Sequence, residues 1–186
     1  MALTDVDWST LPQPEDDGAA AHLIGTMMPA ISVPATTGGP VDVSRLKGLT
    51  IIYAYPMTGR PDVPLPDGWD MIPGARGCTP QSCAFRDHMA ELNALGATSL
   101  FGLSTQSTAY QAEAAARLHL PFPLLSDEDL SLTHALRLPT MEVAGMTLIK
   151  RLTLILRDAE IVHVNYPVFP PDADVDRVID WLQTET

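Results

Sequence analysis

Cys78 and Cys83, the only two cysteines of the chain, are the residues best suited to chemistry. A thiolate is a nucleophile and a metal ligand, so two thiols this close in sequence suggest redox exchange, nucleophilic attack or metal binding. Two cysteines five positions apart are an unusual zinc pair, and the five histidines show no ligand spacing, so we expect no metal. Thiols in cytosolic proteins are usually inert, so their context decides whether they react.

The residues around Cys78 predict that it lies at the start of a helix. Pro80 fits a first helical turn, and a residue before proline is pushed away from helical angles, so Thr79 is the expected N-cap. Cys78 then sits at or just outside the helix start, where the positive end of the helix dipole favours thiolate over thiol. Cys83 lies inside the helix without this advantage. We therefore expect Cys78 to be the attacking thiol and Cys83 the second thiol.

Helix geometry limits how these two thiols can pair. In one regular helix, five residues of 100° and about 1.5 Å rise each place the two Cα atoms roughly 8.6 Å apart, on different faces. A disulfide needs less than about 7 Å. If Cys78 and Cys83 pair, the first turn must unwind, and the hypothesis is a redox-driven local unfolding. Gln81 and Ser82 are expected to face solvent.

The elements around this helix indicate an α/β fold. Residues 50–55 and 99–104 are apolar without polar alternation, as in central strands buried on both faces. Phe85, Met89 and Leu92 recur at i, i+4 and i+7 and extend the helix that follows the cysteines.

Two more helices are expected further along the chain. The first spans 108–118, where Thr108 and Gln111 can form a capping box before an alanine-rich stretch. The second follows the polar residues 126–129.

The last part of the chain predicts a hairpin and a closing helix. Residues 148–156 and 161–166 flank a polar turn and are expected to pair. An amphipathic period then identifies the last helix, through Val175, Val178, Ile179 and Leu182. The acidic residues of 172–176 are expected to provide favourable charge at its N-terminus.

This element order predicts a three-layer, thioredoxin-like α/β domain with a mixed central sheet and helices on both faces. A nucleotide-binding fold is less favoured, because no glycine-rich phosphate loop follows the first strand. Residues 1–23 are expected to form an N-terminal arm and 24–186 the domain. A proline-rich insertion is expected at about 59–75.

Charge and segment composition exclude several classes of partner. With 23 acidic and 11 basic side chains the net charge is −12, which opposes binding to nucleic acid and to anionic lipid. No apolar run approaches the length of a membrane span, and the first 25 residues lack the pattern of a secretory signal. We expect a reducing, cytoplasmic location.

Several segments together resemble one family. They are GCTPQSCAFRD around the two cysteines, GLSTQSTAY and PFPLLSDEDLSL in the middle, and KRLTLILRDAEIVHV in the hairpin. With these motifs the chain resembles the peroxiredoxins, specifically the bacterioferritin-comigratory (PrxQ-type) branch, over most of its length.

The resemblance implies a thiol peroxidase that reduces hydrogen peroxide and organic hydroperoxides. Cys78 matches the peroxidatic position, Cys83 the resolving position of an intramolecular disulfide, and Arg151 the active-site arginine. A permanently charged guanidinium suits that role, since it stabilises both a thiolate and the charge that develops on peroxide oxygens. The implied reductant is a thioredoxin-like or glutaredoxin-like dithiol protein, with no metal, haem or flavin. The protein is expected to be a monomer or homodimer.

One position departs from the family pattern, which has Thr or Ser three residues before the peroxidatic cysteine. Ala75 stands there, so Thr58 or Thr79 must supply any hydroxyl, and Thr58 is preferred. The insertion, which carries Trp69 and Met71, is expected to shape either a pocket for bulkier hydroperoxides or an interface.

Two other functions fit the same scaffold. A thiol-disulfide oxidoreductase is less favoured, because such enzymes use C-x-x-C and four residues separate these cysteines. A non-catalytic redox sensor stays open because of Ala75.

Overall fold

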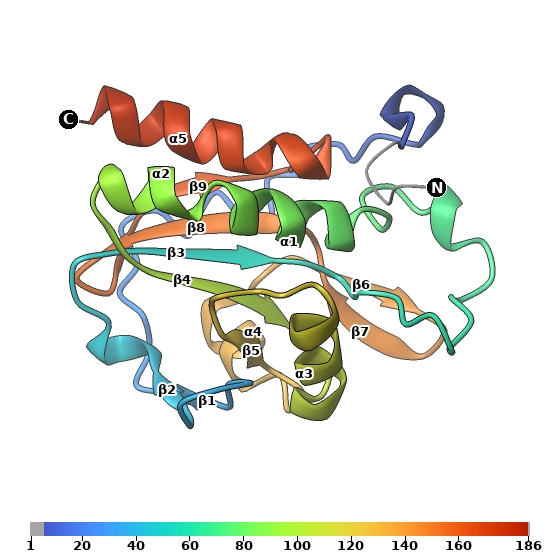
Figure 1. Ribbon diagram of the computed structural model, residues 1–186, viewed down its shortest axis with the longest axis horizontal. Helices are drawn as coiled ribbons and strands as arrows, with labels where there is room; N and C mark the ends of the chain where they lie inside the picture. The colour runs from blue at the N-terminus through green and yellow to red at the C-terminus, as the bar shows by residue number, and fades with distance from the viewer. Residues whose placement is uncertain (1–5, 186) are drawn as a thin grey trace.

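The centre of the computed structural model, which describes residues 6–185, is a five-stranded sheet in the order β5-β4-β3-β8-β9 (Figure 1). Strands β3, β4 and β5 are parallel, and β8 and β9 complete the sheet as antiparallel neighbours. The strands are β3 (Leu49–Ala54), β4 (Ala97–Ser104), β5 (Leu124–Ser126), β8 (Leu152–Arg157) and β9 (Glu160–Asn165). The predicted mixed sheet is confirmed.

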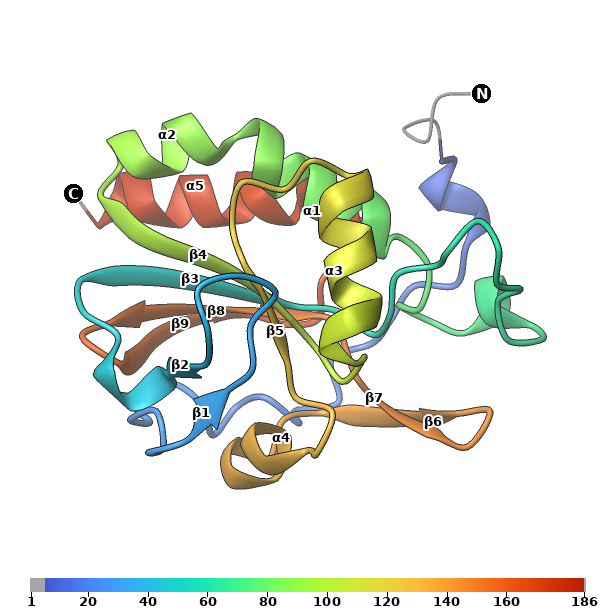
Figure 2. The same cartoon turned by 60° about the horizontal axis from the view of Figure 1, so that its bottom comes forward.

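Helices cover both faces of this sheet, as the sequence predicts. One face carries α1 (Cys78–Asp87), α2 (Met89–Ala94) and α5 (Asp174–Thr184) (Figure 1). Helix α4 (Ser131–Leu136) packs on the other face, and α3 (Thr108–Arg117) lies against β5 (Figure 2).

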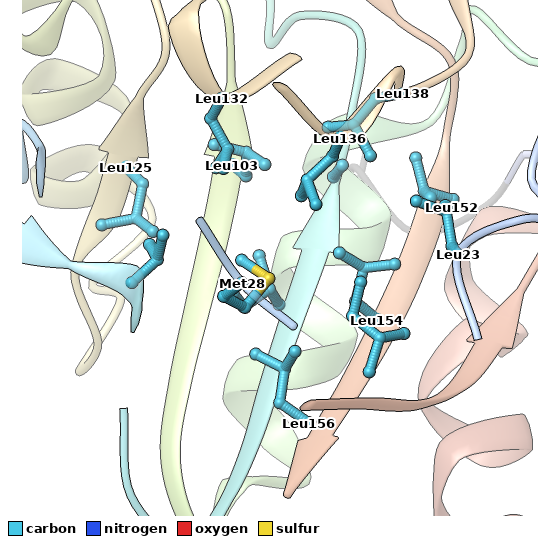
Figure 3. Close-up of a cluster of buried hydrophobic side chains, with 14 of the residues drawn as sticks. Leu23, Met28, Leu103, Leu125, Leu132, Leu136, Leu138, Leu152, Leu154 and Leu156 are labelled. Carbon is cyan, nitrogen blue, oxygen red and sulfur yellow. The ribbon is translucent and has the colours of Figure 1, made fainter. Parts of the chain in front are cut away.

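Successive side chains of β3 point to opposite faces of the sheet, and each face is covered by a core. Ile51 and Tyr53 point into the core under α1 and α5, whereas Ile52 and Ala54 point into the core under α4. Figure 3 shows this second core, in which leucines of β4, β8 and α4 meet. A strand that is buried on both faces does not alternate between apolar and polar side chains. The continuous apolar run of residues 50–55 therefore predicted this strand correctly.

The smaller elements connect or border these layers. They are η1 (Trp8–Thr10), β1 (Ser32–Val33), β2 (Val41–Asp42), η2 (Val43–Arg45), η3 (Trp69–Met71), β6 (Thr140–Val143), β7 (Met146–Ile149) and η4 (Pro171–Ala173). Among residues 6–185, no helix has the length and apolar character needed to cross a membrane.

The predicted helices and the predicted hairpin are present, with three differences. The helix after the cysteines breaks at His88 into α1 and α2, although Phe85 and Leu92 still share one core. Helix α3 is capped by Ser107, whose side chain accepts a hydrogen bond from the Tyr110 N–H, so the predicted capping box is wrong.

The third difference lies in the hairpin. β8 and β9 pair as predicted, across a turn in which Asp158 and Ala159 have φ of 50° and 65°. The strand predicted over 148–156 is interrupted, because β7 ends at Ile149 and pairs with β6 in a separate hairpin. The interruption places Arg151 between two strands with its side chain buried.

Residues 6–28 lie against the body of the domain. Leu23 is completely buried, and the N–H groups of Gly25 and Met28 donate to the carbonyls of Ile161 and Ala159. The insertion is also anchored, because Trp69 and Ala75 pack with residues of the β6–β7 hairpin.

Gly102 tests how tightly the sheet packs. A Cβ at this position of β4 would lie 2.5 Å from Leu124 and 2.9 Å from the ring of Tyr53. We expect Gly102→Ala to lower the free energy of unfolding by about 1 to 3 kcal/mol through overpacking, measured by urea unfolding. Ser99→Ala, a control in the same strand, should change it by less than about 0.5 kcal/mol. An unchanged midpoint for Gly102→Ala would contradict this packing.

Candidate active site

Cys78 is the first residue of α1 and is 3% exposed. The residue that precedes the helix is Gly77, not Thr79, so the predicted N-cap is wrong. Gly77 has φ of 110°, and a Cβ there would lie 2.5 Å from Pro171 and 2.9 Å from Trp8, so only glycine fits. Pro80 still falls within the first turn, where backbone N–H groups lack helical partners.

Arg151, which lies between β7 and β8, contacts this thiol. Its Nη2 lies 3.3 Å from Cys78 Sγ and also donates to the carbonyls of Gly74, Ala75 and Arg76. The side chain is 3% exposed, and no ion pair to it is found within residues 6–185. A buried cation without a carboxylate partner exerts its field on the sulfur with little screening.

Gln81 links the arginine to a second buried group. Its Oε1 accepts a hydrogen bond from Arg151 Nη1, and its Nε2 donates to Asp174 Oδ2 at 2.8 Å. Gln81 and Ser82 are 0% and 1% exposed, so the prediction that they face solvent is wrong. Gln81 faces η4 and α5, and the i, i+3 spacing places it on the face of Cys78. The Ser82 hydroxyl instead accepts a hydrogen bond from Tyr53 of β3.

Asp174 is a completely buried carboxylate that the sequence did not single out. It accepts hydrogen bonds from Gln81, from Thr153 Oγ1 at 2.6 Å and from Asn165 Nδ2 at 3.0 Å. Burial raises its pKa above the ordinary value, although the three hydrogen bonds act in the opposite direction. Asp174 and Asp176 lie in the first turn of α5, where the sequence predicts acidic residues, but the Asp174 side chain faces inward.

Cys83 lies in the same helix as Cys78, and both thiols are free. Cys83 is half-buried, and this burial raises its pKa, with the positive charge of Arg86 acting against the shift. In the helical form Cys83 is thus mostly a thiol, and helix geometry keeps it beyond disulfide distance from Cys78.

The two candidate hydroxyls lie in different places. Thr58 is buried, and its Oγ1 and N–H both approach Gln106 Oε1, at 3.3 and 3.0 Å. Thr79 instead lines the pocket beside Cys78. Ala75 offers no hydroxyl, and its backbone carbonyl accepts a hydrogen bond from Cys78 Sγ at 3.7 Å.

A pocket of about 480 Å³ opens beside Cys78, between the start of α1 and the insertion. Its walls include Met57, Leu65, Trp69 and Pro80. This volume lies within the usual range for small-molecule sites. Among residues 6–185, no three metal-ligating side chains gather in one place.

Together, the fold and this site define a thioredoxin-like redox protein that holds one thiol at a helix start against a buried guanidinium. The profile of the redoxin family matches residues 23–179. Chloroplastic peroxiredoxin Q of Sedum lineare is 30% identical over 162 residues, which cover 86% of this chain and 77% of the relative. The chain therefore belongs to the redoxin family, as a peroxiredoxin of the Q, or bacterioferritin-comigratory, type.

Solved structures agree with this assignment and confirm the expected fold class. Peroxidoxin BcpB of Mycobacterium tuberculosis superposes with a TM-score of 0.70 at 25% identity, covering 88% of this chain and 97% of its own. The bacterioferritin comigratory protein of Xanthomonas campestris has a TM-score of 0.66 at 21% identity, covering 95% and 98%, and shares the fold.

The buried carboxylate predicts a pH dependence of stability. The folded state holds the Asp174 proton more tightly than the unfolded chain, where the ordinary pKa is 3.8. The stability from this group is thus present below that value and is lost as the pH rises through the higher folded-state pKa. In urea unfolding, wild-type stability relative to Asp174→Asn should fall over this interval and then level off.

Asp176→Asn removes an exposed carboxylate of the same helix and serves as the matched control. The difference between wild type and this control should lack the fall. A wild-type advantage over Asp174→Asn that grows with pH would contradict the direction assigned to Asp174.

Proposed function

We propose that this peroxiredoxin is a thiol peroxidase whose Cys78 thiolate cleaves the O–O bond of hydrogen peroxide and organic hydroperoxides. The observation that carries the proposal is the 3.3 Å approach of Arg151 Nη2 to Cys78 Sγ, in a buried site with a pocket beside it. The Xanthomonas campestris relative is described by its alkyl peroxide reduction activity, which supports the inclusion of organic hydroperoxides.

In the first step the Cys78 thiolate attacks the terminal oxygen of ROOH. An S–O bond forms as the O–O bond breaks, the sulfur gives up two electrons, and RO⁻ leaves and takes a proton from solvent. The products are Cys78 sulfenic acid and ROH. Arg151 stabilises first the thiolate and then the charge on the leaving oxygen. Gln81 fixes the guanidinium by accepting from Nη1.

In the second step Cys83 attacks the sulfur of the sulfenic acid. A disulfide forms and water leaves, with no further oxidant required. Because both cysteines begin in α1, this step requires the first turn of the helix to open. A thioredoxin-like or glutaredoxin-like dithiol protein then reduces the disulfide in two exchange steps. We place this cycle in a reducing, cytoplasmic compartment.

The hydroxyl that assists peroxide binding is better supplied by Thr79 than by Thr58. Thr79 lines the Cys78 pocket, whereas the Thr58 hydroxyl is directed at Gln106. Thr58 is instead bound to Gln106, which accepts a hydrogen bond from its N–H and donates one to its carbonyl.

A redox sensor is the second candidate, and the absence of a hydroxyl at Ala75 favours it. Such a protein would be oxidised at Cys78 but would not turn over. Measurement of turnover therefore separates the two functions.

The cycle predicts distinct results for three variants in peroxide consumption coupled to a thioredoxin system. Cys78→Ser should abolish activity, and Cys83→Ser should lose turnover yet accumulate a sulfenic acid that can be trapped and weighed. Arg151→Ala should slow Cys78 oxidation by about 100-fold, the usual cost of losing one stabilising donor. Arg117→Ala removes a cation from the outer wall of the pocket and should cost much less. Oxidation of Cys78 without any turnover would identify a sensor.

The packing of Trp8 is expected to restrain the opening of the first turn of α1. Its ring packs at Gly77, its Nε1 donates to Asp172 at 3.0 Å, and it meets Phe169 edge-on. Opening the first turn breaks this packing, so Trp8→Ala should speed formation of the Cys78 to Cys83 disulfide by roughly fivefold, about 1 kcal/mol of lost aromatic contact.

The rate is measured by rapid quench and thiol labelling after one equivalent of peroxide. Trp181→Ala is the matched control, since that ring stacks on His163 at the outer part of α5. Equal rates for wild type and Trp8→Ala would show that the arm does not restrain the helix.

A further inference from the structure

The insertion and the neighbouring β7 carry exposed apolar side chains. Val63, Leu65 and Met71 of the insertion are 42%, 44% and 70% exposed, and Met146 of β7 is 39% exposed. Leu65 lines the Cys78 pocket itself. Val63 and Met146 line one further pocket together, and apolar surface that gathers in this way often marks a binding site.

A second pocket, of about 510 Å³, adjoins the first. Met57 lines both pockets, so the two meet at this side chain. The apolar lining of the second pocket comes from the insertion and from the β6–β7 hairpin, through Val63, Pro64, Pro66, Met146 and Leu148. Apolar side chains therefore line the cavities on both sides of Met57, and Cys78 lines the first of them.

The walls of the two pockets are held in place before any ligand binds. Trp69 is 5% exposed and packs with Leu148 of the hairpin. Arg60 pairs with Asp62 at 3.0 Å and lies 5.5 Å from the centre of the Tyr110 ring. A preformed cavity avoids the entropic cost of ordering loops on binding.

The charge of the second pocket selects among ligands. Among the described residues that line it, Glu128 is the one acidic side chain and none is basic. An anionic tail is therefore disfavoured and a neutral apolar tail is favoured.

We propose that the second pocket binds the neutral, apolar tail of an organic hydroperoxide while its –OOH group lies at Cys78. The inference rests on the proposed peroxidase function and adds the substrate class and the residues that select it. Hydrogen peroxide has no tail and needs only the first pocket. A small molecule suits this site better than a protein partner, because both cavities are concave and the first of them is lined by Cys78.

The test compares oxidation rates across a series of substrates. Second-order rate constants for Cys78 oxidation in the full chain are measured by rapid quench and mass spectrometry, with hydrogen peroxide and with ethyl, butyl, hexyl and octyl hydroperoxide. A methylene that is half-buried should raise the rate constant by about twofold until the second pocket is filled.

Single substitutions show which residues cause the dependence of the rate constant on tail length. Met146→Ser and Val63→Ser should each lower the octyl rate constant by roughly five- to tenfold and leave the hydrogen peroxide rate within about twofold. The hydrogen peroxide rate in the same sample reports that the variant is folded and active. Met27→Ser replaces another exposed methionine, which lines neither pocket, and it should change neither rate.

Three results would overturn the proposal: rate constants independent of tail length, equal effects of Met146→Ser and Met27→Ser, or an effect of Met146→Ser confined to reduction by thioredoxin or to oligomeric state. The last would identify a protein-docking face. If wild-type Cys78 does not react with hydrogen peroxide at all, the proposed peroxidase function fails instead, so the two failures are distinguishable.

Discussion

The contact between a sulfur and a buried, unpaired guanidinium organises this molecule. Burying a cation is costly unless neighbouring groups satisfy it, and Gln81 and three backbone carbonyls do so for Nη1 and Nη2 of Arg151 without neutralising its charge, while Nε has no hydrogen-bond partner within residues 6–185. A carboxylate in direct contact would have been the more stabilising choice, but it would have cancelled the field at Cys78. Asp174 is instead held one residue away, behind Gln81, where it orients the amide so that its oxygen faces the arginine.

The same contact explains the construction of the surrounding elements. Arg151 lies in the break between β7 and β8, and backbone carbonyls at the end of the insertion accept its hydrogen bonds. Gly77 allows the helix start to approach Pro171 and Trp8 closely. The helix that presents Cys78 is consequently well supported in its folded form. That form is suited to attack on peroxide, whereas pairing with Cys83 requires its first turn to open, so the two halves of the proposed cycle need different conformations.

The insertion connects this chemistry to the choice of substrate. Its inner residues, such as Trp69, pack firmly, while Val63 and Leu65 leave apolar surface open near the thiol. Rigid support beneath an exposed apolar wall is typical of a binding site, because flexible apolar loops collapse on themselves or aggregate.

Local patterns in the sequence were enough to predict the two-thiol helix, the doubly buried β3 and the amphipathic α5, because periodicity and turn residues act over a few positions. The family motifs named Arg151, but only the tertiary structure brings it to a sulfur 73 positions away. Local reasoning failed for Gln81 and Asp174, which look like surface residues and are buried because η4 and α5 close over α1. The β6–β7 hairpin is local, with a turn at Ala144 and Gly145, whereas the two pockets depend on contacts between distant segments. Such contacts are decided by packing of the whole chain, which no short window of residues contains.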